Sequence, residues 1–276
     1  MRHCLIFYAN EFMNLSVSIV VFKSLRFHLL RTLCSLRRAA SHKRDLKVSI
    51  FIVDNDSEDN DLRAWLSGQG FEGLNWISGQ GNIGFGRAHN LVLEEVSSDF
   101  HLILNPDVDI STEGISNGLN FFTEHPECGL ITPVTTDKDG QKQVLCKMYP
   151  TILDLTLRGF APVWLKSIFS KRLDEYAMKG INTESVYWDP PIVSGCFMLF
   201  RTEVLKGLGG FDPRFFLYFE DFDLSLRASK ITKVAYVPSV KIVHYGGEAA
   251  RKGLKHIVFF VHSAVMFFNK HGWKIH

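Results

Sequence analysis

The sequence lacks a long hydrophobic run. A membrane-spanning helix needs about 18 to 20 consecutive apolar residues, and the longest candidate, Ile257 to Phe268, is interrupted by His262 and Ser263. The N-terminus also lacks the charged, apolar and small-residue layout of a secretion signal. Because Met13 directly precedes a strand-like run, we interpret residues 1–12 as an N-terminal extension. These absences predict a cytoplasmic protein without a spanning helix.

An excess of charge of one sign is also absent. The chain has 31 Lys plus Arg against 29 Asp plus Glu, whereas nucleic-acid-binding domains usually show a strong basic excess. The five cysteines are scattered and form no C-x-x-C pair, which argues against structural zinc and for a reducing compartment. No linker, repeat or low-complexity segment divides the chain. The sequence therefore predicts a single domain at 13–276 and no nucleic-acid partner.

Apolar runs of strand length alternate with helical patterns along the first half. Near-continuous apolar strands separated by helices are typical of a parallel sheet that is covered on both faces. We therefore predict an α/β fold with a mostly parallel central sheet and helices on both faces. The predicted strands are 17–22, 48–53, 74–77, 100–104, 129–132 and 192–201, with others near Val234 and Ile242. The predicted helices include 25–40, 60–66, 87–96, 222–230 and 251–270, and a helical, basic stretch at 149–180.

Polar motifs follow three of these strands. Asp54 and Asn55 come after the second strand, a glycine-rich loop at 79–86 after the third, and the segment 105–109 (Asn-Pro-Asp-Val-Asp) after the fourth. In open α/β sheets, ligands bind beyond the carboxyl ends of the strands. The sequence therefore predicts a ligand site at this edge of the sheet.

Three side chains in these regions are candidate metal ligands. Asp107 and Asp109 place two carboxylates just past a buried strand, and hard divalent cations prefer carboxylate, phosphate and water oxygens. A solvated turn that caps the next helix is the alternative. His244 ends a predicted strand and precedes a glycine turn, which favours ligation. A single histidine is otherwise more often structural than a ligand.

The loop at 79–86 has four glycines in eight residues and leads into a helix. Glycines permit positive φ and close ligand approach, and a helix N-terminus favours anions. A tight structural turn would use glycines in the same way. The loop matches neither the phosphate-binding Walker A sequence nor the G-x-G-x-x-G spacing of a dinucleotide-binding fold.

Three acidic residues lie close together between aromatic residues near the start of a predicted helix. Asp223 and Arg227 are four residues apart, the spacing of a structural ion pair on a helix. Glu220 and Asp221 remain at the helix entrance, where a carboxylate beside apolar walls can act as a general base. The alternative is that all three acids are helix caps and surface charge.

Taken in order, these segments resemble the family 2 glycosyltransferases of the GT-A fold. Within that family they are similar to the rhamnosyltransferase-like branch, which builds bacterial cell-surface polysaccharides. The resemblance runs from about Leu15 to Trp273, and although each motif alone is weak, seven in the family's order are specific. The motifs are 18–22 (SIVVF), 53–57 (VDNDS), 82–86 (NIGFG) with Asn90, 104–107 (LNPD), 194–198 (SGCFM), 209–212 (GGFD) and 220–227 (EDFDLSLR), with His244 last.

The resemblance implies a GT-A domain with a nucleotide-sugar-binding half at 13–132 and an acceptor-side, catalytic half at 133–276. It implies that Asp221 is the catalytic base, with Glu220 as the alternative. It also implies that a divalent metal, Mg²⁺ or Mn²⁺, is bound by Asp107, Asp109 and His244. The donor-binding residues that it implies are Phe22, Asp54, Asn55, Asn82, Gly84, Phe85, Asn90, Asn105, Asp107 and Gly195.

The implied reaction is a single inverting displacement. A sugar, expected to be rhamnose from dTDP-rhamnose, moves onto a saccharide or a polyprenyl-diphosphate-linked acceptor in the synthesis of an O-antigen-like polysaccharide. Such a displacement needs a base for the acceptor hydroxyl and charge neutralisation on the leaving diphosphate. Many relatives carry Tyr-Asn after the first strand, where this chain has Phe22-Lys23-Ser24. Recognition of the base and ribose at this position is therefore open.

Two other functional classes stay open on the residues. A nucleotidyltransferase that acts on sugar phosphates also uses paired acids on an α/β sheet, but it normally has a glycine-rich, basic loop after the first strand, which residues 23–25 do not form. A non-catalytic nucleotide-sugar-binding module would not need Glu220 and Asp221 together with Asp107 and His244. Release of nucleoside diphosphate indicates glycosyl transfer, whereas release of pyrophosphate indicates nucleotidyl transfer.

Two predicted helical segments combine basic with large apolar side chains. They are residues 153–179 and the final helix at 251–270. Basic residues beside aromatic ones suit an anionic membrane surface. Burial of the apolar faces against the domain is the alternative. We predict peripheral contact with the cytoplasmic face of the inner membrane.

Overall fold

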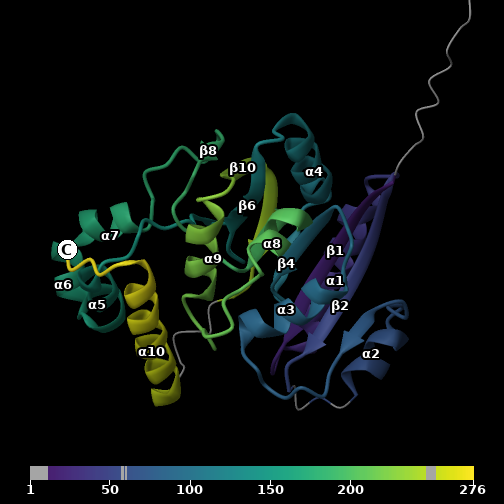
Figure 1. Cartoon of the computed structure of the whole chain (residues 1–276), viewed down its shortest axis with the longest axis horizontal. Coiled ribbons are helices and arrows are strands. Elements are labelled where there is room, and N and C mark those ends of the chain that lie inside the picture. Colours follow the sequence, from purple (N-terminus) through teal and green to yellow (C-terminus); the bar gives the residue numbers. More distant parts are fainter. Residues whose placement is uncertain (1–11, 57–58, 60, 247–252) are drawn as a thin grey trace, which may run out of the picture.

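The computed structural model describes residues 12–56, 59, 61–246 and 253–276. Within these residues the chain forms one mixed sheet with helices packed on both of its faces (Figure 1). The predicted α/β fold class is therefore confirmed. The predicted N-terminal extension, apart from Phe12, lies outside the described residues.

The N-terminal part of the sheet is parallel, and its central strands are deeply buried. Its strands are β1 (Met13–Val21), β2 (Leu46–Asp54), β3 (Asn75–Ile77) and β4 (Phe100–Leu104), with β1 between β2 and β4. Both faces of β1 are covered, since Val17, Ser18 and Ile19 each have 0% exposure. Burial is nearly continuous in β1 and β4 and in the last part of β2, whereas β3 is only partly buried. Burial on both faces favours the apolar runs from which these strands were predicted.

The remaining six strands of the described residues extend the same sheet. They are β5 (Val108–Ile110), β6 (Cys128–Thr136), β7 (Lys142–Gln143), β8 (Tyr187–Trp188), β9 (Phe197–Arg201) and β10 (Lys233–His244). The order across the sheet is β3-β2-β1-β4-β9-β6-β10-β5, with β7 paired to β6 and β8 paired to β10. The antiparallel strand β9 joins β4 to β6, so strands from both halves alternate in one sheet.

Three of the predicted strands differ from the structure. The strands expected near Val234 and Ile242 are one strand, β10, whose pairing with β6 shifts register between Val237 and Lys241. Pro238 lies in this irregular stretch, where its missing N–H costs no ladder bond. The strand predicted from Ile192 begins later, because the residues before β9 form only an isolated bridge to Lys147.

The helices divide between the two faces of the sheet and enclose two apolar cores. One core gathers side chains of α1, α2 and α4 against β1, and the other gathers those of α3, α8 and α9. The bounds are α1 (Arg26–Ser41), α2 (Leu62–Gly68), α3 (Phe85–Glu95), α4 (Gly114–Glu124), α8 (Thr202–Gly207) and α9 (Glu220–Ala228). In Figure 1, the helices within residues 152–176 and the final helix lie at the end of the molecule away from β1 and β2.

The stretch predicted as helical at 149–180 is three short helices. They are α5 (Ile152–Phe160), α6 (Val163–Ile168) and α7 (Ser170–Tyr176), and the final helix is α10 (Leu254–His271). A third core of phenylalanines joins α10 to the start of α9 through Phe219, Phe267 and Phe268. Some of the many phenylalanines thus pack α10 against α9. In the described part of the chain, no helix is long and apolar enough to cross a membrane.

Candidate active site

A carboxylate and an imidazole meet where β5 and β10 pair. Asp107 lies in the turn between β4 and β5, and His244 ends β10 opposite Val108. The Tyr245 N–H donates to the Asp107 carbonyl at 2.9 Å, and His244 Nε2 lies 3.4 Å from Asp107 Oδ1. A Cβ at Gly246 would lie 2.7 Å from the His244 ring and 3.1 Å from Asp107 Oδ2, so this turn requires glycine.

The Asp107–His244 pair fits a divalent cation. Asp107 Oδ1 is buried and has no hydrogen-bond partner among the described residues, which is costly unless a ligand supplies one. Two atoms that bind one cation at about 2.1 Å can be at most about 4.2 Å apart, and this pair meets that limit at 3.4 Å. Carboxylate oxygen suits Mg²⁺ and Mn²⁺, and neutral imidazole is a common metal ligand.

Asp109 does not join this pair. It belongs to β5, whose neighbouring residues Val108 and Ile110 are buried in the core that contains α1. Because side chains alternate along a strand, Asp109 points to the opposite face of the sheet. Its Oδ1 accepts a hydrogen bond from Arg38 at 3.1 Å. Among the residues that the structure describes, no group of three or more His, Cys, Asp or Glu side chains is placed to hold a metal. Of the three predicted ligands, the structure thus brings Asp107 and His244 together and places Asp109 apart from them.

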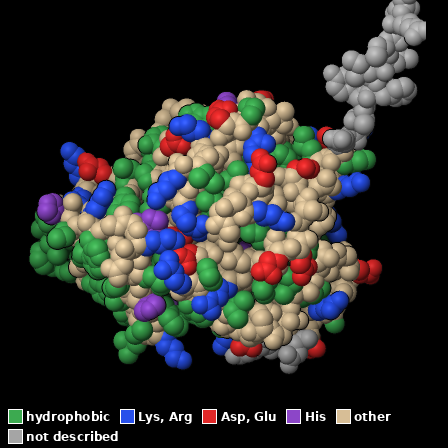
Figure 2. Space-filling view, viewed as in Figure 1, with side chains coloured by type: hydrophobic (Ala, Val, Ile, Leu, Met, Phe, Trp, Pro, Cys, Tyr) green, Lys and Arg blue, Asp and Glu red, His purple; other side chains and the backbone are tan. Residues whose placement is uncertain are grey.

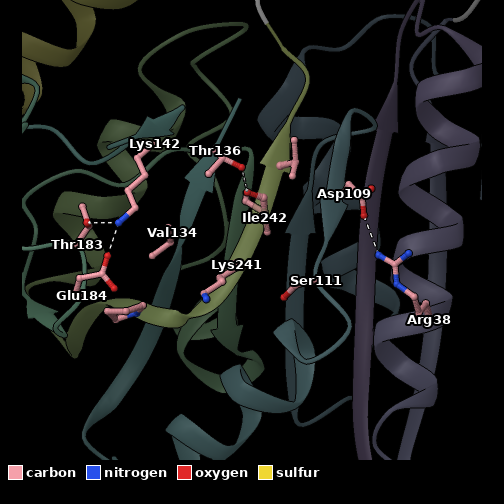
Figure 3. Close-up of a pocket in the computed structure, with 12 residues that line it drawn as sticks. Arg38, Asp109, Ser111, Val134, Thr136, Lys142, Thr183, Glu184, Lys241 and Ile242 are labelled. Atoms are coloured by element: carbon pink, nitrogen blue, oxygen red, sulfur yellow. Dashed lines mark hydrogen bonds and ion pairs between the residues drawn. The ribbon is translucent and has the colours of Figure 1, made fainter. Parts of the chain in front are cut away.

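Asp109 instead lines a cavity of about 520 Å³ on the other face of β10. Figure 3 shows Asp109 and Arg38 on one side of this cavity and Lys142 with Glu184 on the other. Lys241 reaches it from the strand floor between them. None of the predicted donor-binding residues lines this cavity.

The predicted base, Asp221, is held in place by backbone N–H groups. Left-handed conformations at Tyr218 and Phe219, with φ of 70° and 64°, turn the chain into α9. Asp221 Oδ2 accepts from the Gly195 N–H at 3.0 Å, and Oδ1 accepts from the Phe222 N–H at 2.9 Å. A Cβ at Gly195 would lie 3.3 Å from the Cβ of Asp221, so glycine lets this loop approach the carboxylate closely.

Burial raises the pKa of Asp221, while the charge of Lys147 and the N–H donors act in the opposite direction. Lys147 lies with its Nζ 5.5 Å from the Phe222 ring, and no sequence pattern marked it as part of the site. Glu220 is 6% exposed, and its Oε2 has no hydrogen-bond partner among the described residues. Burial, followed by the charge of Asp221, raises the pKa of Glu220 to about 8. At neutral pH Glu220 is therefore largely neutral, while Lys147 and the N–H donors favour the charged form of Asp221.

The third acid of this cluster is structural, as predicted. Asp223 Oδ2 accepts from Arg227 Nε at 2.7 Å, four residues along α9. Its Oδ1 contacts His271 Nε2 at 2.8 Å and Lys270 Nζ at 2.5 Å. These contacts tie the end of α10 to α9 beside the phenylalanine core.

Several predicted donor-binding residues shape the loop before α3. The Asn55 amide donates to Asn82 Oδ1 at 3.0 Å and accepts from the Ile83 N–H at 3.0 Å. Asn82 Oδ1 also accepts from the Gly84 N–H at 3.1 Å. Gly84 has φ of 94°, and a Cβ there would collide with the Phe216 carbonyl. Asn55 and Asn82 therefore fix the conformation of the loop.

Asn90 performs a similar task one turn further along α3. Its side chain donates to the Phe211 carbonyl at 2.8 Å and accepts from the Phe211 N–H at 2.9 Å. Gly210 has φ of 68°, and a Cβ there would collide with Asn90. Phe211 in turn packs edge-on against Phe85, with ring centroids 5.8 Å apart. Asn90 thus positions the segment that supports Phe85.

The remaining predicted donor residues lie near the same edge of the sheet. Asp54 ends β2, and its carbonyl accepts from Gln80 of the glycine loop at 2.8 Å. Phe22 follows β1 and is 43% exposed. The Asn105 N–H donates to the Cys196 carbonyl at 2.9 Å, which connects the turn of Asp107 to the loop of Gly195.

Comparison with protein families matches residues 16–209 to the family described as "Glycosyl transferase family 2". The chain is therefore a glycosyltransferase. The chain belongs to glycosyl transferase family 2.

Two relatives are rhamnosyltransferases by name. The chain is 26% identical over 262 residues to the "N-acetylglucosaminyl-diphospho-decaprenol L-rhamnosyltransferase" of Mycobacterium tuberculosis, covering 89% of this chain and 82% of that protein. It is 30% identical over 204 residues to "Rhamnosyltransferase WbbL" of Escherichia coli, covering 70% of this chain and 72% of that one. The chain is thus similar to rhamnosyltransferases, as the sequence motifs predicted.

Solved glycosyltransferase structures share the fold. GalNAc-T7, crystallised with UDP, GalNAc and Mn²⁺, has a TM-score of 0.67 at 16% identity; the match covers 94% of this chain and 48% of that one. The mannosyltransferase PcManGT of Pyrobaculum calidifontis, with GDP-Man and Mn²⁺, has a TM-score of 0.63 at 15% identity, over 93% of this chain and 63% of that one. This chain therefore spans about half to two thirds of these structures.

Proposed function

We propose that this chain transfers a sugar from a nucleoside diphosphate sugar by an inverting, metal-dependent displacement. The main support is that the turn of Asp107 and the buried base Asp221 both contact the short loop of Gly195 and Cys196. Asn105, two residues before Asp107, bonds to Cys196, and the adjacent Gly195 bonds to Asp221. A cation position and a general base on either side of one loop are what displacement of a diphosphate requires.

The residues have separate tasks in this reaction. Asp107 and His244 would hold Mg²⁺ or Mn²⁺, which when bound offsets charge on the diphosphate. Asp221 accepts the proton of the acceptor hydroxyl as that oxygen bonds to the anomeric carbon and the bond from this carbon to the diphosphate breaks. The N–H groups of Gly195 and Phe222 orient the Asp221 carboxylate. Glu220, neutral at pH 7, adds no second negative charge.

The proposed donor is dTDP-rhamnose, and the proposed acceptor is a saccharide or a polyprenyl-diphosphate-linked saccharide. Support comes from the relatives, since the mycobacterial protein is named for rhamnose transfer to a diphospho-decaprenol acceptor. A panel of dTDP-, UDP- and GDP-sugars tests the donor by release of nucleoside diphosphate with Mn²⁺. Robust transfer from a UDP-hexose with none from dTDP-rhamnose would refute the donor assignment.

The proposal includes peripheral contact with the cytoplasmic face of a membrane. Trp164 and Ile168 on α6 are 65% and 69% exposed, and Val258 on α10 is 64% exposed. Figure 2 shows hydrophobic side chains together with basic ones on the side of the molecule where Figure 1 places these helices. Lys166 and Lys255 lie on the same two helices, and each basic residue near an anionic surface contributes about 1 kcal/mol.

Only part of the two predicted segments, 153–179 and 251–270, is exposed and able to contact a membrane. Leu157 of α5 and Phe267 and Phe268 of α10 are buried, so the alternative of packing against the domain holds for them. The predicted basic residues Arg251 and Lys252 lie outside the described residues.

Flotation with anionic liposomes at low salt tests the membrane contact. The double substitution Trp164→Ser and Ile168→Ser should reduce the floating fraction. Ile231→Ser, which changes an apolar residue of 59% exposure off these helices, is the matched control. Wild-type protein that stays soluble would contradict this contact without affecting the proposed reaction.

A further inference from the structure

Helix α1 packs directly along the turn that carries Asp107. Thr32 Oγ1 accepts a hydrogen bond from the Val108 N–H at 3.1 Å. On the other side of the same turn, the Tyr245 N–H donates to the Asp107 carbonyl at 2.9 Å. These two bonds fix the register of α1 against the Asp107–His244 pair. They bring Arg31, the neighbour of Thr32, to the ring of Tyr245.

Arg31 lies against two aromatic rings. Its guanidinium carbon is 4.1 Å from the ring centroid of Tyr245 and 4.9 Å from that of Phe27. Stacking on aromatic faces holds a guanidinium in place while its N–H groups stay available at the edge. Among the described residues, no hydrogen bond or ion pair to an acceptor occupies these N–H groups. The other arginines of α1 are bound, Arg26 by Asp59, Arg37 by the Gly70 carbonyl and Arg38 by Asp109.

Arg31 is placed to bind an anion beside the Asp107–His244 pair. Tyr245, on which it stacks, directly follows His244 in the chain. A diphosphate bound there carries more negative charge than one divalent cation offsets, and a planar guanidinium binds phosphate oxygens through two parallel N–H bonds. We propose that Arg31 binds the diphosphate group of a substrate next to the Asp107–His244 site. This inference rests on the proposed function, since it assigns a residue to the same site.

Two substrates of the proposed reaction can carry this diphosphate: the nucleotide donor or a lipid-linked acceptor. Equilibrium binding to the full chain with Mn²⁺ distinguishes them. The probes are dTDP, UDP and GDP, the matching nucleosides, and farnesyl diphosphate. The variants are Arg31→Gln, Arg31→Lys and, as matched control, Arg37→Gln. Arg37 also lies on α1 and stacks on an aromatic ring, that of Phe71 at 4.4 Å, but it bonds to Gly70.

If Arg31 binds the donor diphosphate, Arg31→Gln weakens the preferred nucleoside diphosphate about ten- to a hundredfold, and nucleoside binding is unchanged. Arg31→Lys keeps part of the affinity, because lysine retains the positive charge but lacks the two parallel N–H donors of the guanidinium. Arg37→Gln binds like the wild type. If the source is the acceptor, only farnesyl diphosphate binding falls by this amount. Either result supports the assignment.

Unchanged binding of both diphosphates in Arg31→Gln would overturn the assignment. Equal weakening of nucleoside and nucleoside diphosphate would also overturn it, because that result indicates a packing role. Failure of the proposed function looks different. In that case the wild-type protein itself binds no nucleoside diphosphate with Mn²⁺, and the role of Arg31 falls with it.

Discussion

Replacing Asp221 by Asn should remove most turnover while leaving donor binding nearly intact. The change deletes the proton acceptor, and a positioned general base contributes about 10²- to 10⁴-fold to a rate. That range corresponds to about 3 to 5 kcal/mol in the activation free energy. Because the base acts mainly in the transition state, kcat should fall much more than the donor affinity.

The structure also indicates what else this substitution changes. Both Asp221 oxygens accept from backbone N–H groups, those of Gly195 and Phe222. Asn offers only one acceptor oxygen, so one of these bonds is lost, at a cost of about 1 to 3 kcal/mol in the free energy of unfolding. Urea unfolding of the variant measures this cost separately, so that a loss of folded protein is not mistaken for a loss of the base.

Glu220→Gln is the matched control for the same experiment. Burial and the charge of Asp221 raise the pKa of Glu220 to about 8, so this residue is largely neutral at pH 7 and a neutral amide resembles it. Steady-state kinetics should show turnover within about tenfold of wild type, a loss below the usual range for a general base. If Asp221→Asn kept near-normal turnover while Glu220→Gln abolished it, the assignment of the base would be reversed.

The other predictions address the metal, the loop of Gly195 and the buried histidines. Asp107→Asn and His244→Ala should each raise the Mn²⁺ concentration needed for half-maximal activity by about tenfold or more, whereas Asp109→Asn should not, and a shared effect of all three would contradict the two-residue site. Gly195→Ala should lower kcat with little change in thermal stability, because the added Cβ would lie 3.3 Å from the Asp221 Cβ and 3.4 Å from Phe85; normal kcat would count against this positioning role. Burial lowers the pKa of His89 and of His101 to about 3. Below about pH 6.5 the unfolded chain therefore takes up protons at these histidines while the folded chain does not. Each histidine should lower the free energy of unfolding by about 2 kcal/mol at pH 5 and have no such effect above pH 7. Urea unfolding at both pH values checks this, and a His101→Gln variant with an unchanged pH dependence would contradict it.

The central parallel strands could be predicted from the sequence because both of their faces are buried. Such a strand is a continuous apolar run, as in β1, and its limits follow from the polar residues around it. The edge of the sheet was harder to predict. Strand β5 is three residues long, and β10 contains Pro238, which divides its apolar pattern into two. Sequence patterns also did not indicate that β9 would insert antiparallel between β4 and β6.

For the site, too, the sequence predicted some residues and missed others. The sequence indicated Asp107, His244 and Asp221, because each follows a strand or begins a helix at the expected edge. It grouped Asp109 with Asp107 through their spacing, but one residue belongs to a turn and the other to a strand, so their side chains diverge. Lys147 and Arg31 reach the site from segments without a motif. Their place depends on tertiary packing, namely the bridge of Lys147 to Ile192 and the register of α1.

Product analysis is the measurement that tests metal-dependent glycosyl transfer most directly. The purified chain is incubated with Mn²⁺, dTDP-rhamnose and a diphospholipid-linked N-acetylglucosamine, and the nucleotide and saccharide products are separated. We expect release of dTDP in equal amount to an extended saccharide with inverted anomeric configuration, and loss of both when the metal is chelated. Release of pyrophosphate, or equal transfer after complete chelation, would contradict it.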